Sequence, residues 1–190
     1  MLKDLLNENR SCRTFDESRR VSREELCDMI ECARLTPSTM NMQPLCFRLV
    51  TDAKELAAVQ ALTKWGGALP ELHLPPEGHR PTAFIVVCQD IEKFGSPDKF
   101  LRDVGICDLA ISLRAAEMGL GSCIIGSFDR EKLPGALGLA DKIAVLQVIG
   151  IGKPDEVRRV VEAKDGATRY YRDGEGVHCV PKRPLSELIL

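Results

Sequence analysis

A chain of 190 residues, 44% of them hydrophobic and 28% charged, can bury a substantial core within one domain. Its formal net charge of -2 gives no reason to expect a nucleic acid or an anionic membrane as a partner, and no apolar run reaches the length of a membrane span. Any positive charge that matters for function is therefore expected to be local.

The spacing of cysteines and histidines argues against a disulfide scaffold and against a metal site. The eight cysteines contain no Cys-x-x-Cys pair, and residues 1–4 do not form an export signal. We therefore expect reduced thiols and a cytoplasmic protein. His73, His79 and His178 lack the spacing of metal ligands, so no metal is predicted.

Two amphipathic helices are predicted near the N-terminus. Leucines on one face predict a short helix from about Leu2 to Asn9. Ser22 and Glu25 have the spacing of a capping box, which predicts a second helix that ends before Pro37. The loop 37–44 that follows lies between two prolines and is rich in hydroxyl and amide side chains.

Apolar strands and helices alternate in the rest of the chain. Strands are predicted at 46–50, 83–88, 122–125 and 143–149, the last closed by glycines from residue 150, and helices at 52–64, at 97–118 and just after Asp129. The helix 97–118 is apolar around most of its circumference, which favours the centre of a domain or a subunit interface. The tail predicts only an edge strand at 168–171 and a last short helix at 185–190.

Residues 65–81 form an unusually long connection. Three glycines, four prolines and the chain's only tryptophan, Trp65, lie in this stretch. Because long loops in compact domains are often functional, we expect a lid in which Trp65 stacks on an aromatic substrate. The alternative is that Trp65 packs on the core and the loop is merely mobile.

Basic and hydroxyl side chains follow the first helix. Arg10, Ser11 and Arg13 bring two guanidinium groups and a hydroxyl within four residues. Arginine offers planar pairs of donors that match phosphate oxygens, and serine adds a compact donor. The pattern suits an anion site, and a solvated arginine pair fits the spacing equally well.

Two glycine-rich segments lack the context of nucleotide-binding motifs. Gly119-x-Gly121 follows a predicted helix and precedes a strand, which is the reverse of the dinucleotide fingerprint. Gly150-x-Gly152-Lys153 lacks the hydroxyl residue that a P-loop requires after lysine. Neither motif is predicted to bind a nucleotide.

Four separated segments together resemble one protein family. They are Arg10-Ser11-x-Arg13-x-Phe15, Pro37-Ser38-x-x-Asn41-x-Gln43-Pro44, Gly119-x-Gly121-Ser122-Cys123-Ile124-Ile125-Gly126 and Lys182-Arg183. In order and spacing, over nearly the whole chain, they are similar to the FMN-dependent nitroreductase family. The resemblance implies one α+β domain spanning 1–190, with a central mixed β-sheet flanked by helices, in an intertwined homodimer with FMN at the subunit interface.

The resemblance also implies how the chain holds FMN. Arg10, Ser11 and Arg183, together with Lys182, would hold the phosphate, with Cys12 in the same turn. Residues 155–190 would then be a C-terminal extension ending in the phosphate-binding Lys182-Arg183.

Residues on both faces of the flavin ring are implied in the same way. From the other subunit they would be Pro37, Ser38, Thr39, Asn41 and Gln43, and across the opposite face Ile124, Ile125 and Gly126. Arg13 would lie beside the pyrimidine end, where a fixed guanidinium stabilises the negative charge of the reduced ring. A backbone N–H near Gly126 would mark the nitrogen that accepts hydride. Arg13 and Gly126 are therefore the expected catalytic elements.

The implied function is an oxidoreductase with a ping-pong mechanism. It would take hydride from NAD(P)H through FMN and reduce a nitroaromatic, a quinone or a similar small acceptor. The alternative is a flavin-binding protein for storage or delivery of FMN. Leu45 stands where many family members carry tryptophan after the Gln-Pro pair, which weakens the subfamily assignment more than it weakens cofactor binding.

Overall fold

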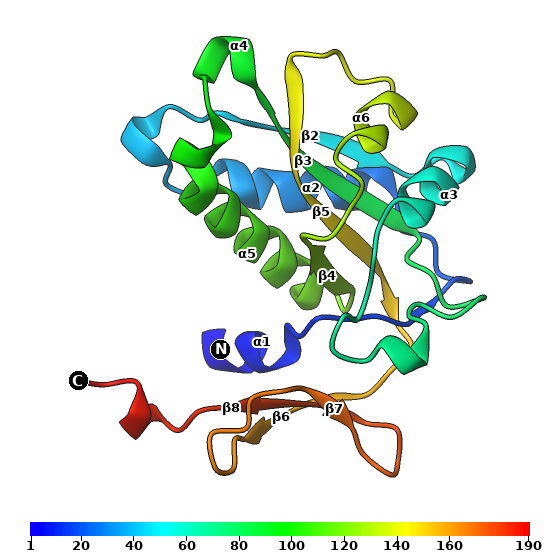
Figure 1. Cartoon of the computed structure of the whole chain (residues 1–190), viewed down its shortest axis with the longest axis vertical. Coiled ribbons are helices and arrows are strands. Elements are labelled where there is room, and N and C mark those ends of the chain that lie inside the picture. Colours follow the sequence, from blue (N-terminus) through cyan, green and yellow to red (C-terminus); the bar gives the residue numbers. More distant parts are fainter.

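The computed structural model describes residues 1–190 and shows an α+β fold with one large sheet and one small sheet (Figure 1). Its helices are α1 (Leu2–Glu8), α2 (Arg23–Arg34), α3 (Ala53–Ala61), α4 (Ile91–Phe94), α5 (Leu101–Glu117) and α6 (Lys132–Ala136). Its strands are β1 (Phe15–Asp16), β2 (Leu45–Val50), β3 (Ala83–Asp90), β4 (Gly121–Ile125), β5 (Ile143–Pro154), β6 (Arg158–Glu162), β7 (Tyr171–Arg172) and β8 (His178–Lys182). Short 3-10 turns lie at Thr39–Asn41, Pro70–Leu72, Pro97–Phe100 and Leu185–Glu187. The expected α+β class is confirmed.

The large sheet has the strand order β1-β5-β3-β2, and β4 also pairs with β5. Its neighbouring strands are antiparallel. β3 is buried along almost its whole length, as its continuous apolar sequence predicts. The centre of the sheet is therefore the centre of the core.

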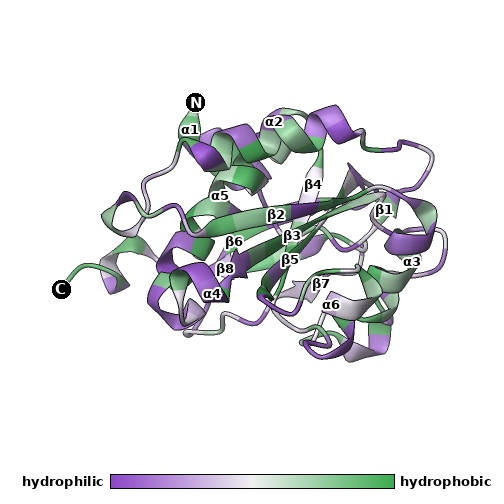
Figure 2. Ribbon diagram, turned by 90° about the horizontal axis from the view of Figure 1, so that it is seen from above, coloured by the Kyte–Doolittle hydropathy of each residue, from purple (hydrophilic) through white to green (hydrophobic).

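Helices cover both faces of this sheet (Figure 2). On one face α2 and α5 bring Leu26 and Ile111 against Ile85 of β3. On the other face α3 and α6 cover a second cluster that includes Leu133 and Phe84. The neighbours Phe84 and Ile85 thus serve opposite layers, as alternation along a strand requires.

β5 is longer than predicted. The expected end at residue 149 is wrong, because the strand continues to Pro154. The glycines make room for large side chains: a Cβ at Gly150 would lie 2.6 Å from the indole of Trp65, and a Cβ at Gly152 would lie 2.9 Å from the ring of Phe15. Close packing, not a turn, explains glycine at these positions.

The predicted helix 97–118 consists of the turn at Pro97–Phe100 and then α5. Its apolar surface is divided between two environments. Val104, Cys107 and Ile111 are buried in the core, whereas Leu101 and Leu109 are about half exposed. One face of α5 therefore remains open in the single chain. No helix combines the length and apolar composition needed to cross a membrane.

The chain after β5 forms a second sheet of order β6-β8-β7, in which β6 and β8 are parallel and β7 is antiparallel to β8. In Figure 1 it lies below α1, away from the large sheet. The predicted edge strand at 168–171 is displaced to β7, the last helix is only the turn Leu185–Glu187, and β6 and β8 were not predicted. The strands of this sheet are short and mixed in polarity, so they lack the alternation by which strands are predicted.

Candidate functional site

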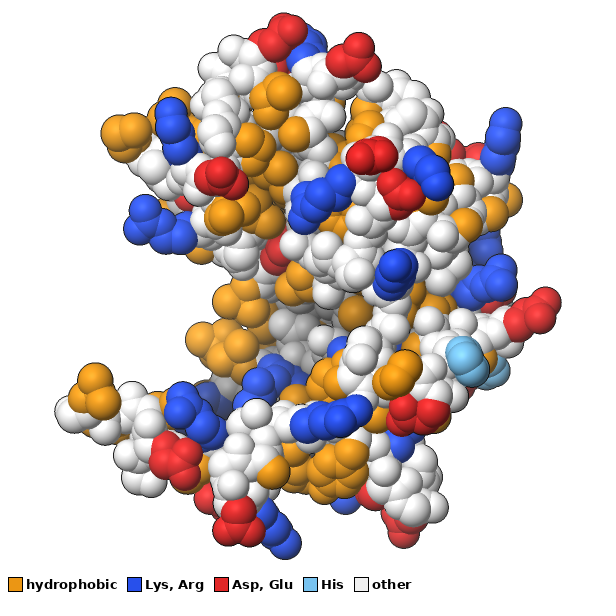
Figure 3. Space-filling view, in the orientation of Figure 1, with side chains coloured by type: hydrophobic (Ala, Val, Ile, Leu, Met, Phe, Trp, Pro, Cys, Tyr) orange, Lys and Arg blue, Asp and Glu red, His pale blue; other side chains and the backbone are white.

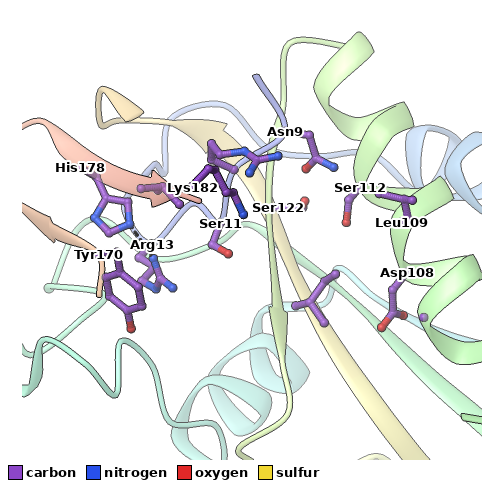
Figure 4. Close-up of a pocket in the computed structure, with 14 residues that line it drawn as sticks. Asn9, Ser11, Arg13, Asp108, Leu109, Ser112, Ser122, Tyr170, His178 and Lys182 are labelled. Atoms are coloured by element: carbon purple, nitrogen blue, oxygen red, sulfur yellow. Dashed lines mark hydrogen bonds between the residues drawn. The ribbon is translucent and has the colours of Figure 1, made fainter. Parts of the chain in front are cut away.

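A cavity of about 440 Å³ lies between the N-terminal turn, α5, β4 and β8 (Figure 4). Its volume is typical of small-molecule sites. The lining residues are Asn9, Arg10, Ser11, Arg13, Gly105, Asp108, Leu109, Ser112, Ser122, Ile124, Tyr170, His178, Val180 and Lys182. We call Arg10, Ser11, Arg13 and Lys182 the cation wall, and we call Asp108, Leu109 and Ser112 the helix wall.

Cys12 fixes the N-terminal turn on β4. Its backbone N–H donates to the Ser122 carbonyl at 2.8 Å. Its side chain packs against Gly121, where an added Cβ would lie 2.9 Å from the thiol sulfur. Burial raises the pKa of the Cys12 thiol to about 12. Cys12 therefore anchors the turn as an uncharged thiol, and its neighbours Ser11 and Arg13 line the cavity.

Arg10 is a partly buried cation, and one of its buried N–H donors has no hydrogen-bond partner. Its Nη2 donates to the Leu6 carbonyl at 2.5 Å, while its Nε is buried without a hydrogen-bond partner. Burial, and after it the charge of Arg158, lowers the pKa of the Arg10 guanidinium. Lys182 lines the same cavity from the end of β8. This concentration of positive charge and the free Nε favour an anionic ligand.

Arg13 is held on three sides. Its backbone N–H donates to Glu156 Oε1 at 2.6 Å, and the other oxygen of Glu156 accepts from Arg172 Nη2 at 2.6 Å. Its Nη1 lies 3.0 Å from Nε2 of His178, and the Tyr170 ring centroid lies 4.6 Å from its Cζ. Figure 4 shows Arg13, Tyr170 and His178 gathered on one side of the cavity. The position of the guanidinium is therefore set before any ligand arrives.

The helix wall has the opposite character. Asp108 and Ser112, one turn apart on α5, are 4% and 3% exposed. Asp108 Oδ1 and Ser112 Oγ have no hydrogen-bond partner. Burial raises the pKa of the Asp108 carboxyl to about 7. Buried polar atoms normally find partners, so this wall is suited to a ligand that brings hydroxyl or N–H groups.

The sequence profile of the nitroreductase family matches residues 6–153. The chain belongs to the nitroreductase family. It is 32% identical to an oxygen-insensitive NADPH nitroreductase of Helicobacter acinonychis, with 78% of this chain and 86% of that protein covered. It is also 32% identical to the Helicobacter pylori protein of the same description, with 85% of this chain and 89% of that protein covered.

Solved structures of nitroreductase proteins have the same fold. An FMN-dependent nitroreductase of Clostridium difficile is 27% identical, with a TM-score of 0.63 over 82% of this chain and 88% of that chain. A protein of Desulfovibrio desulfuricans in complex with FMN is 22% identical, with a TM-score of 0.72 over 100% of this chain and 95% of that chain. The expected nitroreductase-like fold is confirmed.

The residues that the nitroreductase resemblance assigned to the cofactor separate into two groups. Arg10, Ser11, Arg13, Ile124 and Lys182 line the cavity although they come from distant parts of the chain. The structure thus brings together the first, third and fourth of the four sequence segments.

Four other assigned residues lie outside the lining. The side chains of Cys12 and Ile125 are buried in the protein, so these residues can offer a ligand only their backbone. Gly126 lies just past the end of β4, and Arg183 is exposed just past the end of β8. The assignment of these four residues to the cofactor stays a prediction.

The segment 37–43 does not line the cavity of its own chain. Ser38 and Gln43 line a separate cavity of about 260 Å³ next to α5. Thr39 is fixed there, because its backbone N–H and its hydroxyl both donate to Asp103. Pro37 and Asn41 line neither of the two cavities.

Trp65 packs on the core and is absent from the cavity lining. Its ring makes edge contacts with Phe15 and Phe84 at centroid distances of 6.3 and 6.5 Å. Its Nε1 donates to the Thr63 hydroxyl at 3.0 Å. A packed indole cannot stack on a substrate without leaving these contacts. The placement favours the packing alternative over the expected substrate contact.

Sequence reasoning missed the residues that surround and oppose Arg13. Tyr170 and His178 lie in the second sheet or beside it, where the short strands have no periodic pattern that identifies them. Asp108 and Ser112 did carry a signal: two polar residues four apart within the otherwise apolar stretch 104–113 mark one face of the helix. That signal could have placed a polar ligand beside α5.

Proposed function

We propose that this chain binds FMN in the 440 Å³ cavity and uses it to carry electrons from NAD(P)H to a small acceptor such as a nitroaromatic or a quinone. The observation that carries the proposal is the contrast between the two walls. One wall concentrates positive charge, and the other presents buried acceptors without partners. A ligand that satisfies both walls needs an anionic end and hydroxyl groups.

The chemistry of FMN fits this donor set. Its phosphate suits Arg10, Ser11 and Lys182, where the Arg10 Nε is a buried donor without a partner. Its ribityl hydroxyls suit Asp108 and Ser112, whose free oxygens need donors. Its ring suits the apolar parts of the lining that Leu109 and Ile124 supply. Arg183, just beyond β8, is proposed to add charge near the phosphate.

When bound, FMN supplies the hydride chemistry. Arg13 places a fixed guanidinium where negative charge develops during reduction, and its contacts to His178 and Tyr170 hold it there. The backbone N–H of Gly126, at the end of β4, is proposed to orient the nitrogen that accepts hydride. Neither residue needs to accept or release a proton.

A second copy of the chain is proposed to complete the site. Figure 3 shows the molecule hollowed between its main body and its C-terminal arm. Ile106, Leu109 and Ile124, on α5 and β4, are 38%, 46% and 45% exposed. A partner in the hollow would cover this apolar surface and could bring its own residues 37–43 to the ring. Sedimentation equilibrium is expected to give a dimer, and a monomer that binds FMN tightly would contradict this part of the proposal.

The absence of disulfide bonds among the cysteines is compatible with a reducing compartment. All eight cysteines are free. We propose that the protein acts in the cytoplasm, where thiols stay reduced.

Anaerobic mixing with NADH and with NADPH tests the function. Protein carrying FMN should lose its flavin absorbance with at least one nicotinamide, and a nitroaromatic or quinone should then restore it. Release of the nicotinamide before the acceptor reacts should give parallel lines in steady-state double-reciprocal plots. Protein that keeps FMN but does not bleach with either nicotinamide would support flavin storage and contradict the oxidoreductase.

A further inference from the structure

His178 and Tyr170 form a clamp on Arg13, and both lie outside the four sequence segments that resemble the family. The three side chains come from the N-terminal turn, the loop before β7 and the start of β8. His178 Nε2 is 3.0 Å from Arg13 Nη1, and the Tyr170 ring lies 4.6 Å from Arg13 Cζ and 5.2 Å from the His178 ring. Figure 4 shows the contact between Arg13 and His178 at the edge of the cavity.

The contact fixes the protonation state of His178. An arginine side chain only donates hydrogen bonds, so Nε2 of His178 must accept and can carry no proton. The histidine in this arrangement is neutral, with its proton on Nδ1. A second proton on Nε2 would place two donors and two positive charges against each other. The clamp therefore exists only while His178 is neutral.

The surroundings of His178 favour the neutral form. His178 is 2% exposed, and burial followed by the charge of Arg13 holds its pKa below the ordinary value. Arg158 and Arg172 act in the same direction. Glu156 opposes them, but it is already bonded to Arg172 and to the backbone of Arg13.

Tyr170 holds the other face of the guanidinium and is itself fixed. Its hydroxyl accepts a hydrogen bond from the backbone N–H of Ala68 at 3.1 Å. Arg169, the preceding residue, donates to the carbonyl of Ala68 at 2.5 Å. The loop 65–81 therefore supports the aromatic face on which Arg13 rests.

We propose that His178 and Tyr170 are positioning residues that hold the Arg13 guanidinium in the cavity, so that the affinity of the site for its ligand falls when His178 is protonated. The proposal rests on the proposed function only in taking FMN as the ligand. The clamp itself belongs to the protein without FMN.

NMR of the apoprotein tests the clamp without FMN. With ¹⁵N-labelled histidine, His178 should show an unprotonated Nε2 and a protonated Nδ1 at pH 7. It should titrate below the ordinary histidine range near 6.5. A proton on Nε2 at pH 7 would overturn the proposal whether or not the protein binds FMN. The predicted tautomer, with Nε2 unprotonated, together with no FMN binding would instead reject the proposed function and leave the clamp standing.

Titrations of the protein with FMN between pH 5 and pH 8 test whether protonation of His178 weakens binding. In wild type, FMN affinity should fall roughly tenfold as pH decreases through the pKa of His178, which corresponds to the loss of one charge-assisted hydrogen bond. His178→Gln keeps an acceptor that cannot be protonated, so its affinity should lose this pH dependence. His73→Gln is the matched control, because His73 is exposed on the 65–81 loop and outside the cavity. Equal pH dependence in wild type and His178→Gln would overturn the proposal.

Two substitutions of Tyr170 separate its ring from its hydroxyl. Tyr170→Phe keeps the aromatic face under Arg13 and loses only the bond to Ala68. Tyr170→Leu loses the face as well, and it should bind FMN several-fold more weakly than the Phe variant. Melting curves of both apoproteins identify any general loss of folding. Equal FMN affinity of the two folded variants would contradict the role of the ring.

Discussion

The two walls of the cavity differ in how completely their polar groups are satisfied. On the cation wall, Arg13 has contacts from Glu156, His178 and Tyr170 before any ligand binds, and Arg10 Nε is the one buried donor without a partner. On the helix wall, Asp108 Oδ1 and Ser112 Oγ are buried without partners. The prearranged wall can stabilise charge without reorganising, whereas the unsatisfied wall costs stability until a ligand arrives. Binding and stability should therefore respond differently to changes on the two walls.

The largest effect is expected on the cation wall. Replacing Arg10 and Lys182 together by alanine removes two charge-assisted contacts of roughly 1.5–3 kcal/mol each, so FMN affinity should fall by about 100-fold or more. Equilibrium dialysis or flavin fluorescence measures it. The control is Lys54→Ala with Lys64→Ala, two exposed lysines outside this cavity. A double variant that retains its full flavin content through gel filtration would refute the phosphate assignment.

Trp65 tests whether a residue outside both walls contributes to the site. Trp65→Ala removes ring contacts with Phe15 and Phe84 and leaves Gly150 without its neighbour. A loss of roughly 3 kcal/mol is expected, which lowers Tm by about 6–12 °C for a chain of this size. The value of kcat/KM should fall equally for several acceptors. Unequal changes among acceptors at an unchanged Tm would instead restore the lid hypothesis.

Because the helix wall buries the Asp108 carboxyl, the stability of the folded protein should depend on pH. The pKa of Asp108 is raised to about 7 in the folded protein, against roughly 3.9 for an unfolded aspartate. The folded state therefore holds a proton that the unfolded state has lost, and stability is lost as pH rises from about 4 through about 7. Asp108→Asn cannot ionise, so its apoprotein should melt a few degrees above wild type at pH 8 and close to wild type at pH 4.5.

A matched carboxylate gives the control for this experiment. Asp141 is exposed, and Asp141→Asn should not change the pH dependence of Tm. Bound FMN should reduce the difference in Tm between Asp108→Asn and wild type, because its ribityl hydroxyls would donate hydrogen bonds to the wild-type carboxyl. An advantage that does not grow with pH would show that Asp108 is not ionising in a buried site.

The smallest effects on catalysis are expected from substitution of two buried cysteines. Cys12 and Cys123 are buried, and burial raises the pKa of their thiols to about 12 and about 11. Neither thiol is a nucleophile near neutral pH. Cys12→Ser and Cys123→Ser should leave NAD(P)H-driven reduction of bound FMN within a few-fold of wild type in stopped-flow traces. Loss of reduction with FMN still bound would show that a thiol takes part.

Local signals predicted the periodic parts of the fold. The capping box was correct: Ser22 Oγ accepts from the backbone N–H of Glu25, and the Glu25 carboxylate accepts from that of Ser22. β3 was predicted from its apolar run because both of its faces are buried. The end of β5 was misplaced because Gly150 and Gly152 are small for reasons of long-range packing, which adjacent residues do not reveal.

The site was predictable to the extent that it lies in short motifs. Arg10, Arg13 and Lys182 were identified by resemblance, and the fold brings them together. Tyr170 and His178 could not be predicted, because contacts across more than 150 residues of chain set their role. Tyr170 lies just before the two-residue strand β7, and His178 begins the short strand β8, so neither leaves a pattern in the sequence. The packing of Trp65 on Phe15 and Phe84 could not be predicted, because composition marks a long loop but does not reveal which of its residues turn inward.

Comparing FMN with riboflavin tests the central claim most directly. The two flavins differ only in the phosphate, which the cation wall is proposed to hold. Titration of the apoprotein, followed by quenching of flavin fluorescence, should show one FMN per chain and an affinity at least about 100-fold higher for FMN than for riboflavin. Equal affinities for the two flavins would contradict the account, because Arg10, Ser11 and Lys182 would then not bind the phosphate.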